Sequence, residues 1–365
     1  MADVSPSTVS RALSGKEGVS EATRAHILRL AEKTGLIANG DPDRGGTQTN
    51  DWVGERIGVY ADLGRDVAVT LLVDARGNPC LTDLTESTFF MEIIGGLSAA
   101  ARDFGAALHV ARVDEDGDLG AAFGKMEAGP GRSNGVIWLG YQPAASYQPW
   151  IGALEKRETP VVLCDHHVAE LACDAVLSDN VGGSLAAATH VAELGHSRVA
   201  ILQQALPSIA SVLRTRGFRA GLLDYGVSPS DIAVVEAPPS FEGGYDVADA
   251  LLDGGFTAVL CGNDVMAIGV LRRARERGVD VPGEISVSGF DDIATSAQIS
   301  PTLTTVRVDK WAIGYESVRR LLVRILEQRT GIRRPSDSGG STSIRSVVPT
   351  ELIVRESTGE ISKKH

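Results

Sequence analysis

The 365-residue sequence has only four cysteines, and no two of them have the Cys-x-x-Cys spacing. This low count excludes the disulfide framework of a small secreted domain and is typical of buried thiols in a reducing compartment. Long apolar runs are also missing, because no segment approaches the roughly 18 residues of a membrane span. The stretch 1–11 lacks the apolar core of a secretion signal. We therefore expect a cytoplasmic protein with no membrane contact.

Basic side chains are in the minority, with 35 Lys and Arg against 47 Asp and Glu and a formal net charge of -12. This charge opposes non-specific attachment of the whole protein to nucleic acid, so any contact with DNA must be local. Hydrophobic residues make up 43% of the chain, which allows a core of ordinary size and excludes wholesale disorder. The length fits about two compact domains and one small unit.

Catalytic motifs are missing too, since no GxSxG, HExxH or phosphate-loop pattern occurs. Cys164, His166, His167 and Cys173 lie close enough in sequence to suggest zinc. Alternate residues of a strand face opposite ways, however, so Cys164 and His166 diverge from His167. We expect no enzyme activity, no metal and no cofactor.

Short apolar runs alternate with helical patterns over residues 56–355, which is typical of parallel βαβ units. The predicted fold class is α/β, with doubly wound parallel sheets in two lobes. The expected strands are 56–61, 68–74, 135–140, 160–165, 198–203, 257–262 and 285–290, and which of the first two begins the sheet stays open. The expected helices are 89–104, 181–194, 212–224, 245–253 and 264–277. The glycines that follow helices and would close them in the left-handed conformation are Gly105, Gly195, Gly226 and Gly278.

A short helix is predicted over 5–13, where Ser5 is a good N-cap and Pro6 fits the first helical position. A second helix is predicted from Ser20 to a point before Gly35. The segments VSPSTVSRALSG, VSEATRAHILRLAEKTG and IAN resemble the headpiece of the lactose-repressor/galactose-repressor transcription regulators. The resemblance implies that the first helix is the recognition helix of a helix-turn-helix in the major groove. By position it places Pro6, Ser7 and Arg11 at base edges and Ser5, Thr8 and Ser10 at phosphates.

Two features depart from that family. A further helix normally precedes VSPSTVS, whereas only residues 1–4 do so here, so we predict a partial, all-α headpiece over 1–39. That segment has five basic and four acidic residues, which gives weak attraction to phosphate. The linker 40–55 is rich in Gly, Asp and Asn and cannot readily form the family's hinge helix. The hypothesis is that the start codon lies inside the real gene or that the chain as written binds DNA poorly.

The carboxy-terminal half carries a second resemblance to the same family, in TAVLCGNDVMAIGVLRRARERGVDVPGEISVSGFDDIATSAQISPTLTTVRVD and VVPTELIVREST. It implies a periplasmic-binding-protein-like core with an effector between two lobes. The expected lobes are 56–176 with 307–343 and 177–306 with 344–356, followed by a disordered tail at 357–365.

Polar residues follow three of the predicted strands, namely Asp165, Asn263 and Asp291. Ligands of parallel sheets bind beyond the carboxyl ends of the strands, and carboxylate and amide groups suit a polyhydroxylated ligand such as a sugar. The resemblance implies the same three positions as effector contacts. Phe241 and Trp138 are candidates for stacking on a sugar face, although a place in the core explains each equally well.

Two more observations qualify this site. For Asp264 and Asp292 we favour a role in a helix cap or turn. The family commonly has an Arg five residues before the Gly of its R-x-x-G-F stretch, where this chain has Val212. Arg214 lies about 200° further around a helix, so we do not expect it to replace that Arg.

The predicted function is a DNA-binding transcription regulator, a repressor, whose operator affinity is controlled by a small polar effector such as a sugar. A homodimer is expected, because one headpiece contacts too few base pairs to compete with the genome. The alternative is a sugar-binding sensor that no longer binds DNA, and a third, weaker interpretation is an α/β enzyme acting on sugars. The effector, the operator and the direction of the response stay open.

Overall fold

The computed structural model describes residues 20–21, 67–75, 88–113, 134–140, 151, 154, 158–168, 173–205, 208–330 and 343–360. The chain divides into two compact units, Met1–Gly54 and Glu55–His365. Apart from residues 20–21, everything described belongs to the second unit. No helix within the described ranges is both long and apolar enough to cross a membrane.

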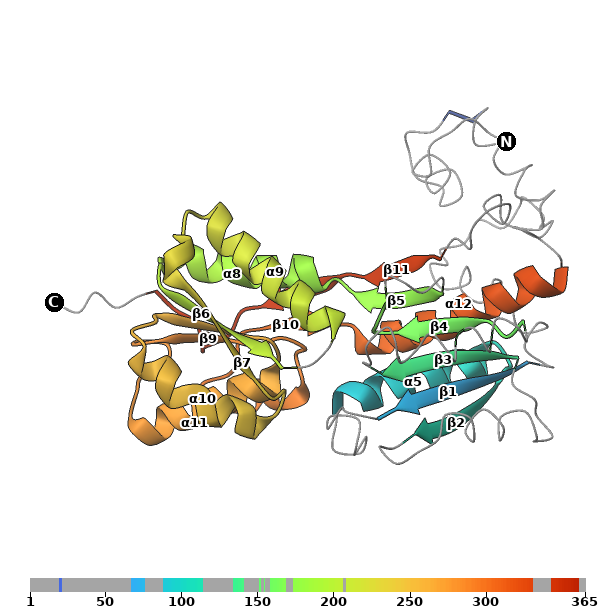
Figure 1. The fold of residues 1–365 in the computed structure, drawn as a ribbon, viewed down its shortest axis with the longest axis horizontal. Helices are drawn as coiled ribbons and strands as arrows, with labels where there is room; N and C mark the ends of the chain where they lie inside the picture. The colour runs from blue at the N-terminus through green and yellow to red at the C-terminus, as the bar shows by residue number, and fades with distance from the viewer. Residues whose placement is uncertain are drawn as a thin grey trace. The chain divides into compact units, whose positions relative to one another are not determined.

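The first lobe is built on a six-stranded sheet in the order β11-β5-β4-β3-β1-β2, with every pairing parallel. Its strands are β1 (Ala68–Asp74), β2 (Ala107–Val113), β3 (Gly135–Gly140), β4 (Val161–Cys164), β5 (Asp174–Ser178) and β11 (Arg345–Val348). Helices α5 (Thr88–Asp103) and α12 (Lys310–Thr330) pack against each other, and α12 runs across β3, β4 and β5 (Figure 1). β1 and β3 are buried along their whole length, which explains their uninterrupted apolar runs.

The second lobe is built on a parallel sheet in the order β7-β6-β8-β9. Its strands are β6 (Val199–Gln204), β7 (Ile232–Ala237), β8 (Ala258–Cys261) and β9 (Ser286–Ser288). The helices are α8 (Asn180–Glu193), α9 (Ile209–Asp224), α10 (Phe241–Asp253) and α11 (Asp264–Arg277), with short 3-10 turns at Pro229–Asp231 and Ala294–Ala297. α8 and α9 pack together on one face of the sheet, and α10 and α11 on the other (Figure 1).

The chain crosses between the lobes three times. The crossings lie between β5 and α8, between β10 (Thr305–Val308) and α12, and between β11 and β12 (Thr350–Ile353), and a single residue joins the elements at each one. Those residues are Asp179, Asp309 and Pro349. β10 and β12 pair as an antiparallel ribbon.

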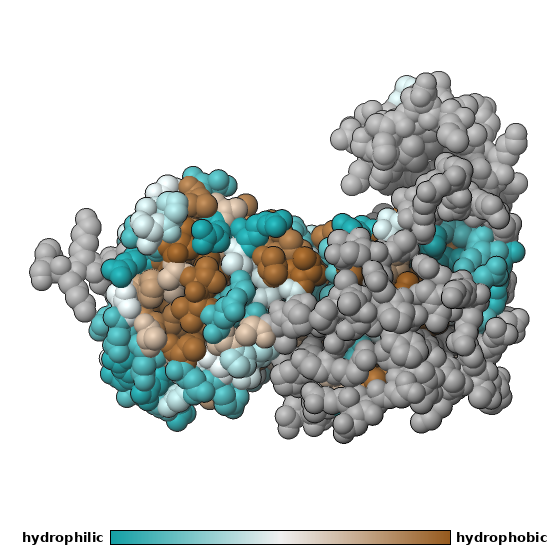
Figure 2. Space-filling view, in the orientation of Figure 1, coloured by the Kyte–Doolittle hydropathy of each residue, from teal (hydrophilic) through white to brown (hydrophobic). Residues whose placement is uncertain are grey.

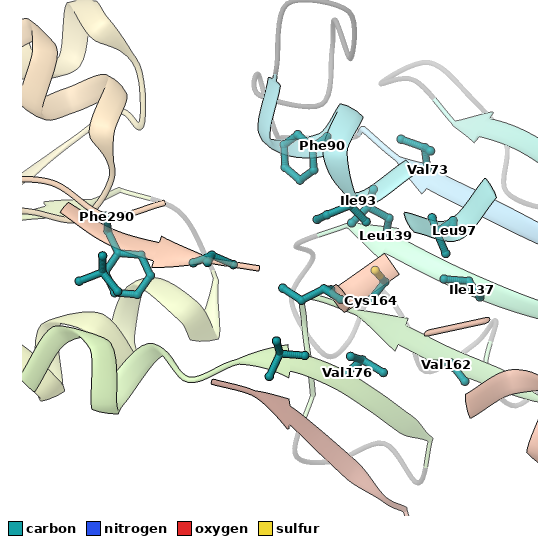
Figure 3. Packing of buried hydrophobic residues seen from close by; sticks show 14 of the residues in the cluster. Val73, Phe90, Ile93, Leu97, Ile137, Leu139, Val162, Cys164, Val176 and Phe290 are labelled. Carbon is teal, nitrogen blue, oxygen red and sulfur yellow. The ribbon is translucent and has the colours of Figure 1, made fainter. Parts of the chain in front are cut away.

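One hydrophobic cluster runs through both lobes. In the first lobe it contains Ile93 and Leu97 of α5 and Ile137 of β3, and in the second it contains Phe290 and Ile201 (Figure 3). Along β6 the buried side chains alternate, because Val199 and Ile201 belong to this cluster while Ala200 and Leu202 pack with α10 and α11. The period of two explains how one strand supports two helical layers.

The predicted α/β class and the two lobes are confirmed, and β1 and β3 have the predicted bounds. Gly105, Gly195, Gly226 and Gly278 all have positive φ, between 69° and 89°, as predicted for residues that close helices. The run 56–61, the headpiece 1–39 apart from residues 20–21, and the linker 40–55 lie outside the described residues.

Three expectations need correction. β5 continues to Ser178, so the first segment of the first lobe ends two residues later than 176. β11 pairs with β5 in the first lobe, although 344–356 was expected in the second, because the pairing continues the parallel sheet. The tail is ordered at its start, since Ser357 is fully buried and donates a hydrogen bond to the Val287 carbonyl (2.6 Å).

Candidate effector-binding site

Aspartates with positive φ angles follow the ends of β4 and β9. Asp165 directly follows β4 with φ 54°, and Asp291 and Asp292 come shortly after β9 with φ 112° and 48°. Such conformations cost about 1–3 kcal/mol each in non-glycine residues and cluster at ligand sites. Both sheets therefore carry strained acidic turns at the edge where parallel sheets bind ligands.

Arg214 is the centre of the site in the second lobe. Its side chain is 5% exposed, and its Nη2 lies 3.0 Å from Asp291 Oδ1. Nε donates to Asn180 Oδ1 (2.8 Å), and Nη1 donates to the Gly262 carbonyl (2.7 Å). The guanidinium also lies 3.8 Å from the centroid of the Phe290 ring. These contacts fix the cation in one position.

Arg214 was not expected at the site from the sequence, yet the structure buries it beside Asp291. Ser208 caps α9 with its side chain on the Ala210 N–H, and this start turns Arg214 toward the sheet. Val212, the position compared with the family's Arg, is 47% exposed instead. Val212 and Arg214 face different ways, as their separation of about 200° around the helix requires, and Arg214 is the one that faces the sheet. The signal was the Arg of the R-x-x-G-F stretch itself.

Asp291 combines burial with a carboxylate oxygen, Oδ1, whose one partner among the described residues is Arg214. Burial raises the pKa of its carboxyl group, while the charges of Arg214 and Lys310 act in the opposite direction. Within the described part of the chain, Oδ1 has the Arg214 ion pair but no hydrogen bond of good geometry. A buried carboxylate oxygen in this state can accept a hydrogen bond from a ligand hydroxyl.

Asn263 has a structural role as well as the predicted place beside the site. Its Oδ1 accepts from the Met266 N–H (2.8 Å) and so caps α11. Among the described residues, its Nδ2 has a single long contact, 3.5 Å to the Pro239 carbonyl. The Asn263 Nδ2 group can therefore donate to a ligand. It adjoins Gly262, whose carbonyl accepts from Arg214.

The two other acidic side chains hold the fold, although the helix cap considered for Asp264 is made by Asn263 instead. Asp264 is fully buried and accepts from the Ile293 N–H (2.9 Å) and from the hydroxyls of Ser296 and Thr305. Burial, with the charge of Asp291 adding to it, raises the pKa of Asp264 to about 7. The Asp292 carboxylate lies between Arg307 (2.8 Å) and Arg355 (2.6 Å).

The remaining predicted residues are more scattered. Asp165 belongs to the first lobe, is buried, and accepts from the Ser178 hydroxyl (3.3 Å). Phe241 is the first residue of α10, is partly exposed and stacks on Tyr245. Trp138, on β3, is 1% exposed and packs in a hydrophobic cluster of the first lobe. It is therefore a core residue and not a stacking surface for a sugar.

The predicted DNA contacts are not part of the described structure. Ser5, Pro6, Ser7, Thr8, Ser10 and Arg11 all lie outside the described residues.

Comparison with known proteins adds the family. Residues 1–39 match the profile described as bacterial regulatory proteins, lacI family, and residues 188–358 match that of a periplasmic binding protein-like domain. The chain belongs to the lacI family. This lacI-family chain is 27% identical to the HTH-type transcriptional repressor CytR of Escherichia coli (strain K12), over 98% of this chain and 94% of CytR.

Two further relatives are informative. An uncharacterized HTH-type transcriptional regulator in the aml 5' region of Streptomyces limosus is 34% identical, over 62% of this chain and 63% of that protein, which is less than two thirds of its length. The structure of the transcriptional regulator CelR in complex with cellobiose matches with a TM-score of 0.67 at 26% identity, over 97% of this chain and 96% of CelR. These relatives are described as regulators of transcription rather than as enzymes.

Proposed function

We propose that this chain is a DNA-binding repressor whose operator affinity is controlled by a sugar. The observation that carries the proposal is the buried pair of Arg214 and Asp291, whose Nη2 and Oδ1 atoms are 3.0 Å apart, beside the carboxyl ends of the strands of the second sheet. Fixed charged donors and acceptors recognise hydroxyl groups well and reject analogues that lack them. Such a site suits the binding of a polyhydroxylated ligand.

The effector contacts that we propose are Asp165, Asn263 and Asp291, together with Arg214. Phe241 would supply an aromatic face at the start of α10. The cellobiose bound to CelR supports a carbohydrate as the class of effector. Asp165 comes from the first lobe and the other residues from the second, so a sugar that contacts both would favour one arrangement of the lobes over another.

DNA binding is proposed for residues 1–39, where the family profile matches. Pro6, Ser7 and Arg11 would contact bases, and Ser5, Thr8 and Ser10 would contact phosphates. Two headpieces are needed for specificity, so we propose a homodimer that acts in the cytoplasm. Exposed apolar side chains of the second lobe would favour self-association, and apolar surface gathers over β7 and α9 (Figure 2). They include Val212, Leu223 and Val234, each at least 40% exposed.

The test is calorimetric titration of the full chain with monosaccharides, disaccharides, polyols and nucleobases. We expect one sugar to bind the wild type and to lose binding in Asp291→Ala and Arg214→Met, while Arg216→Met keeps it. Arg216 is the matched control, since it lies two residues from Arg214 but is exposed. Absence of binding by every sugar, or retention in Asp291→Ala, would refute the proposed effector site.

Selection of operator sequences from random DNA, followed by gel shift, tests the second half of the proposal. A repressor should enrich a two-fold-symmetric sequence and release it, or bind it more tightly, when the sugar is added. Sugar binding without any enriched sequence would instead support the alternative of a sensor that does not bind DNA.

A further inference from the structure

Lys310 is a buried cation placed between the two lobes. It is the first residue of α12, directly after the crossing residue Asp309, and it is 3% exposed. Its Nζ donates to the backbone carbonyl of Asp291 (2.7 Å) and to that of Asp292 (3.2 Å), both in the second lobe. The same Nζ lies 3.7 Å from Glu92 Oε2 and 5.9 Å from the centroid of the Phe89 ring, both on α5 of the first lobe.

The cost of burying this charge makes both sets of contacts necessary. An ammonium group taken out of water loses several kcal/mol of solvation, which only well-placed acceptors restore. Two of the Lys310 acceptors belong to the Asp291–Asp292 turn, and the nearby carboxylate belongs to α5. The charge of Lys310 is therefore well compensated only when the turn and α5 lie on either side of it.

The turn that Lys310 holds is the one that carries the proposed effector contact. The Asp291 side chain meets Arg214, while its backbone N–H donates to the Val306 carbonyl (2.8 Å) of β10. β10 leads through Asp309 directly to Lys310. A displacement of Asp291 thus reaches Lys310 both through the Asp291 carbonyl and along the chain.

We propose that Lys310 couples the Asp291–Asp292 turn to α5 and so sets the arrangement of the two lobes. Lys310 is a positioning residue in this proposal, because it acts through the turn. The inference rests on the proposed function only in taking Asp291 as the effector contact.

The test measures the distance between the lobes in the full chain by pulsed electron spin resonance. Spin labels are attached through Arg102→Cys on α5 and Asp224→Cys at the end of α9, both of which are exposed positions. Cys80 and Cys173 are replaced by Ser. Cys164 and Cys261 are retained, because they are buried and burial raises the pKa of both thiols, which keeps them unreactive. Labelled protein is diluted with unlabelled protein so that distances between copies do not contribute.

We expect Lys310→Met to shift and broaden the distance distribution relative to wild type. Glu92→Gln should shift it in the same direction by less, and the double variant should equal Lys310→Met. Arg319→Met is the matched control, since Arg319 lies on the same helix, is exposed and pairs only with Glu316 among the described residues. It should leave the distribution unchanged.

A wild-type distribution in a folded Lys310→Met protein would overturn the proposal. If Lys310→Met does not fold, Glu92→Gln decides, because Glu92 is half-exposed and its replacement should leave the fold intact. A wild-type distribution for Glu92→Gln overturns the proposal as well. No DNA or sugar is present, so the result is independent of the gel shift and the titration. Failure of the proposed function is thereby distinguished from failure of this inference.

Discussion

At the scale of single residues, the ion pair of Arg214 and Asp291 matters more for specificity than for stability. Two opposite charges are buried together, and the desolvation of such a pair offsets most of its attraction. Replacing both by apolar groups is often neutral, whereas removing one leaves an uncompensated charge. A substitution that removes one of the two residues should therefore lower the stability of the fold, because the other charge stays buried without its partner.

Arg214→Met should lower the free energy of unfolding by about 3–5 kcal/mol, because Asp291 then stays buried with less compensation. Arg216→Met should change it by no more than about 0.5 kcal/mol, as for other exposed positions. Urea unfolding of both variants at neutral pH measures the difference. Equal midpoints for the two variants would contradict the description of Arg214 as a buried, paired cation.

Asp264 predicts a pH dependence of definite sign. Its folded-state pKa of about 7 lies above the ordinary value of 3.8, so the folded protein holds this proton more tightly than the unfolded chain does. The contribution of Asp264 to stability therefore falls as pH rises between those values, by up to about 1.4 kcal/mol per pH unit. Above about pH 7 the Asp264 carboxylate is charged in the folded protein, and the whole destabilisation from its burial is present.

Asp264→Asn removes this titration and keeps an acceptor for the backbone of Ile293. The difference in unfolding free energy between variant and wild type should therefore move in favour of the variant as pH rises from about 5 to about 8. Denaturant titrations across that range measure it. A difference independent of pH would show that Asp264 has an ordinary pKa.

For single residues, the sequence predicts where a side chain stands in the chain of strands and helices better than it predicts what that side chain contacts. Asp165 and Asp291 were expected at strand ends, and both stand there in left-handed conformations. The cap made by Asn263 and the inward face of Arg214 could not be derived, because both depend on where the helices begin. A shift of one or two residues in a helix start changes which side chain points to the sheet.

At the scale of elements, the buried strands and the helix ends follow from local chemistry. β1 and β3 have uninterrupted apolar runs because they are covered on both faces, and glycines close the helices, so these strands and the helix ends were predictable. β2 and β7 were missed because they are edge strands with many exposed or half-buried side chains. β5, β10, β11 and β12 were also missed, and each has only four or five residues. α12 was missed although Ile313, Leu321 and Ile325 stand at helical spacing; what the local pattern does not encode is its packing against α5.

The carboxy-terminal segment behaves as part of the second sheet. The Ser357 hydroxyl donates to the Val287 carbonyl and accepts from the Thr304 N–H (2.8 Å), and the Ser357 carbonyl accepts from the Val287 N–H (2.8 Å). A chain that ends after Glu356 should lose these bonds and several kcal/mol of stability, since each buried unpaired group costs about 1–3 kcal/mol. Thermal unfolding should show the loss.

The matched control ends after Glu360 and keeps every one of these contacts. It should unfold at the same temperature as the full chain. Equal melting temperatures for the two shortened chains would restore the original expectation of a tail without structure from residue 357 onward.

At the scale of the whole molecule, the shared cluster predicts that the two lobes unfold together. The cluster joins α5 and β3 to Phe290, and three single-residue connections link the lobes. All four tryptophans lie outside residues 177–306, so their fluorescence does not come from the main segment of the second lobe. Far-UV circular dichroism reports both lobes.

The two signals should therefore give coincident urea transitions in the wild type, as in a two-state process. Fluorescence and circular dichroism recorded on the same samples provide the comparison. Two separated midpoints would mean that each lobe is stable alone and that the shared cluster contributes little.

The late position of β11 and of Ser357 also bears on how the protein is made. One completes the edge of the first sheet and the other lies beside β9 in the second, and both come near the end of the chain. Neither lobe can finish folding on the ribosome before the segment 345–357 has been synthesised. A chain that ends before residue 345 would leave both lobes incompletely folded and open to proteases. Cells would therefore accumulate only chains that contain this segment.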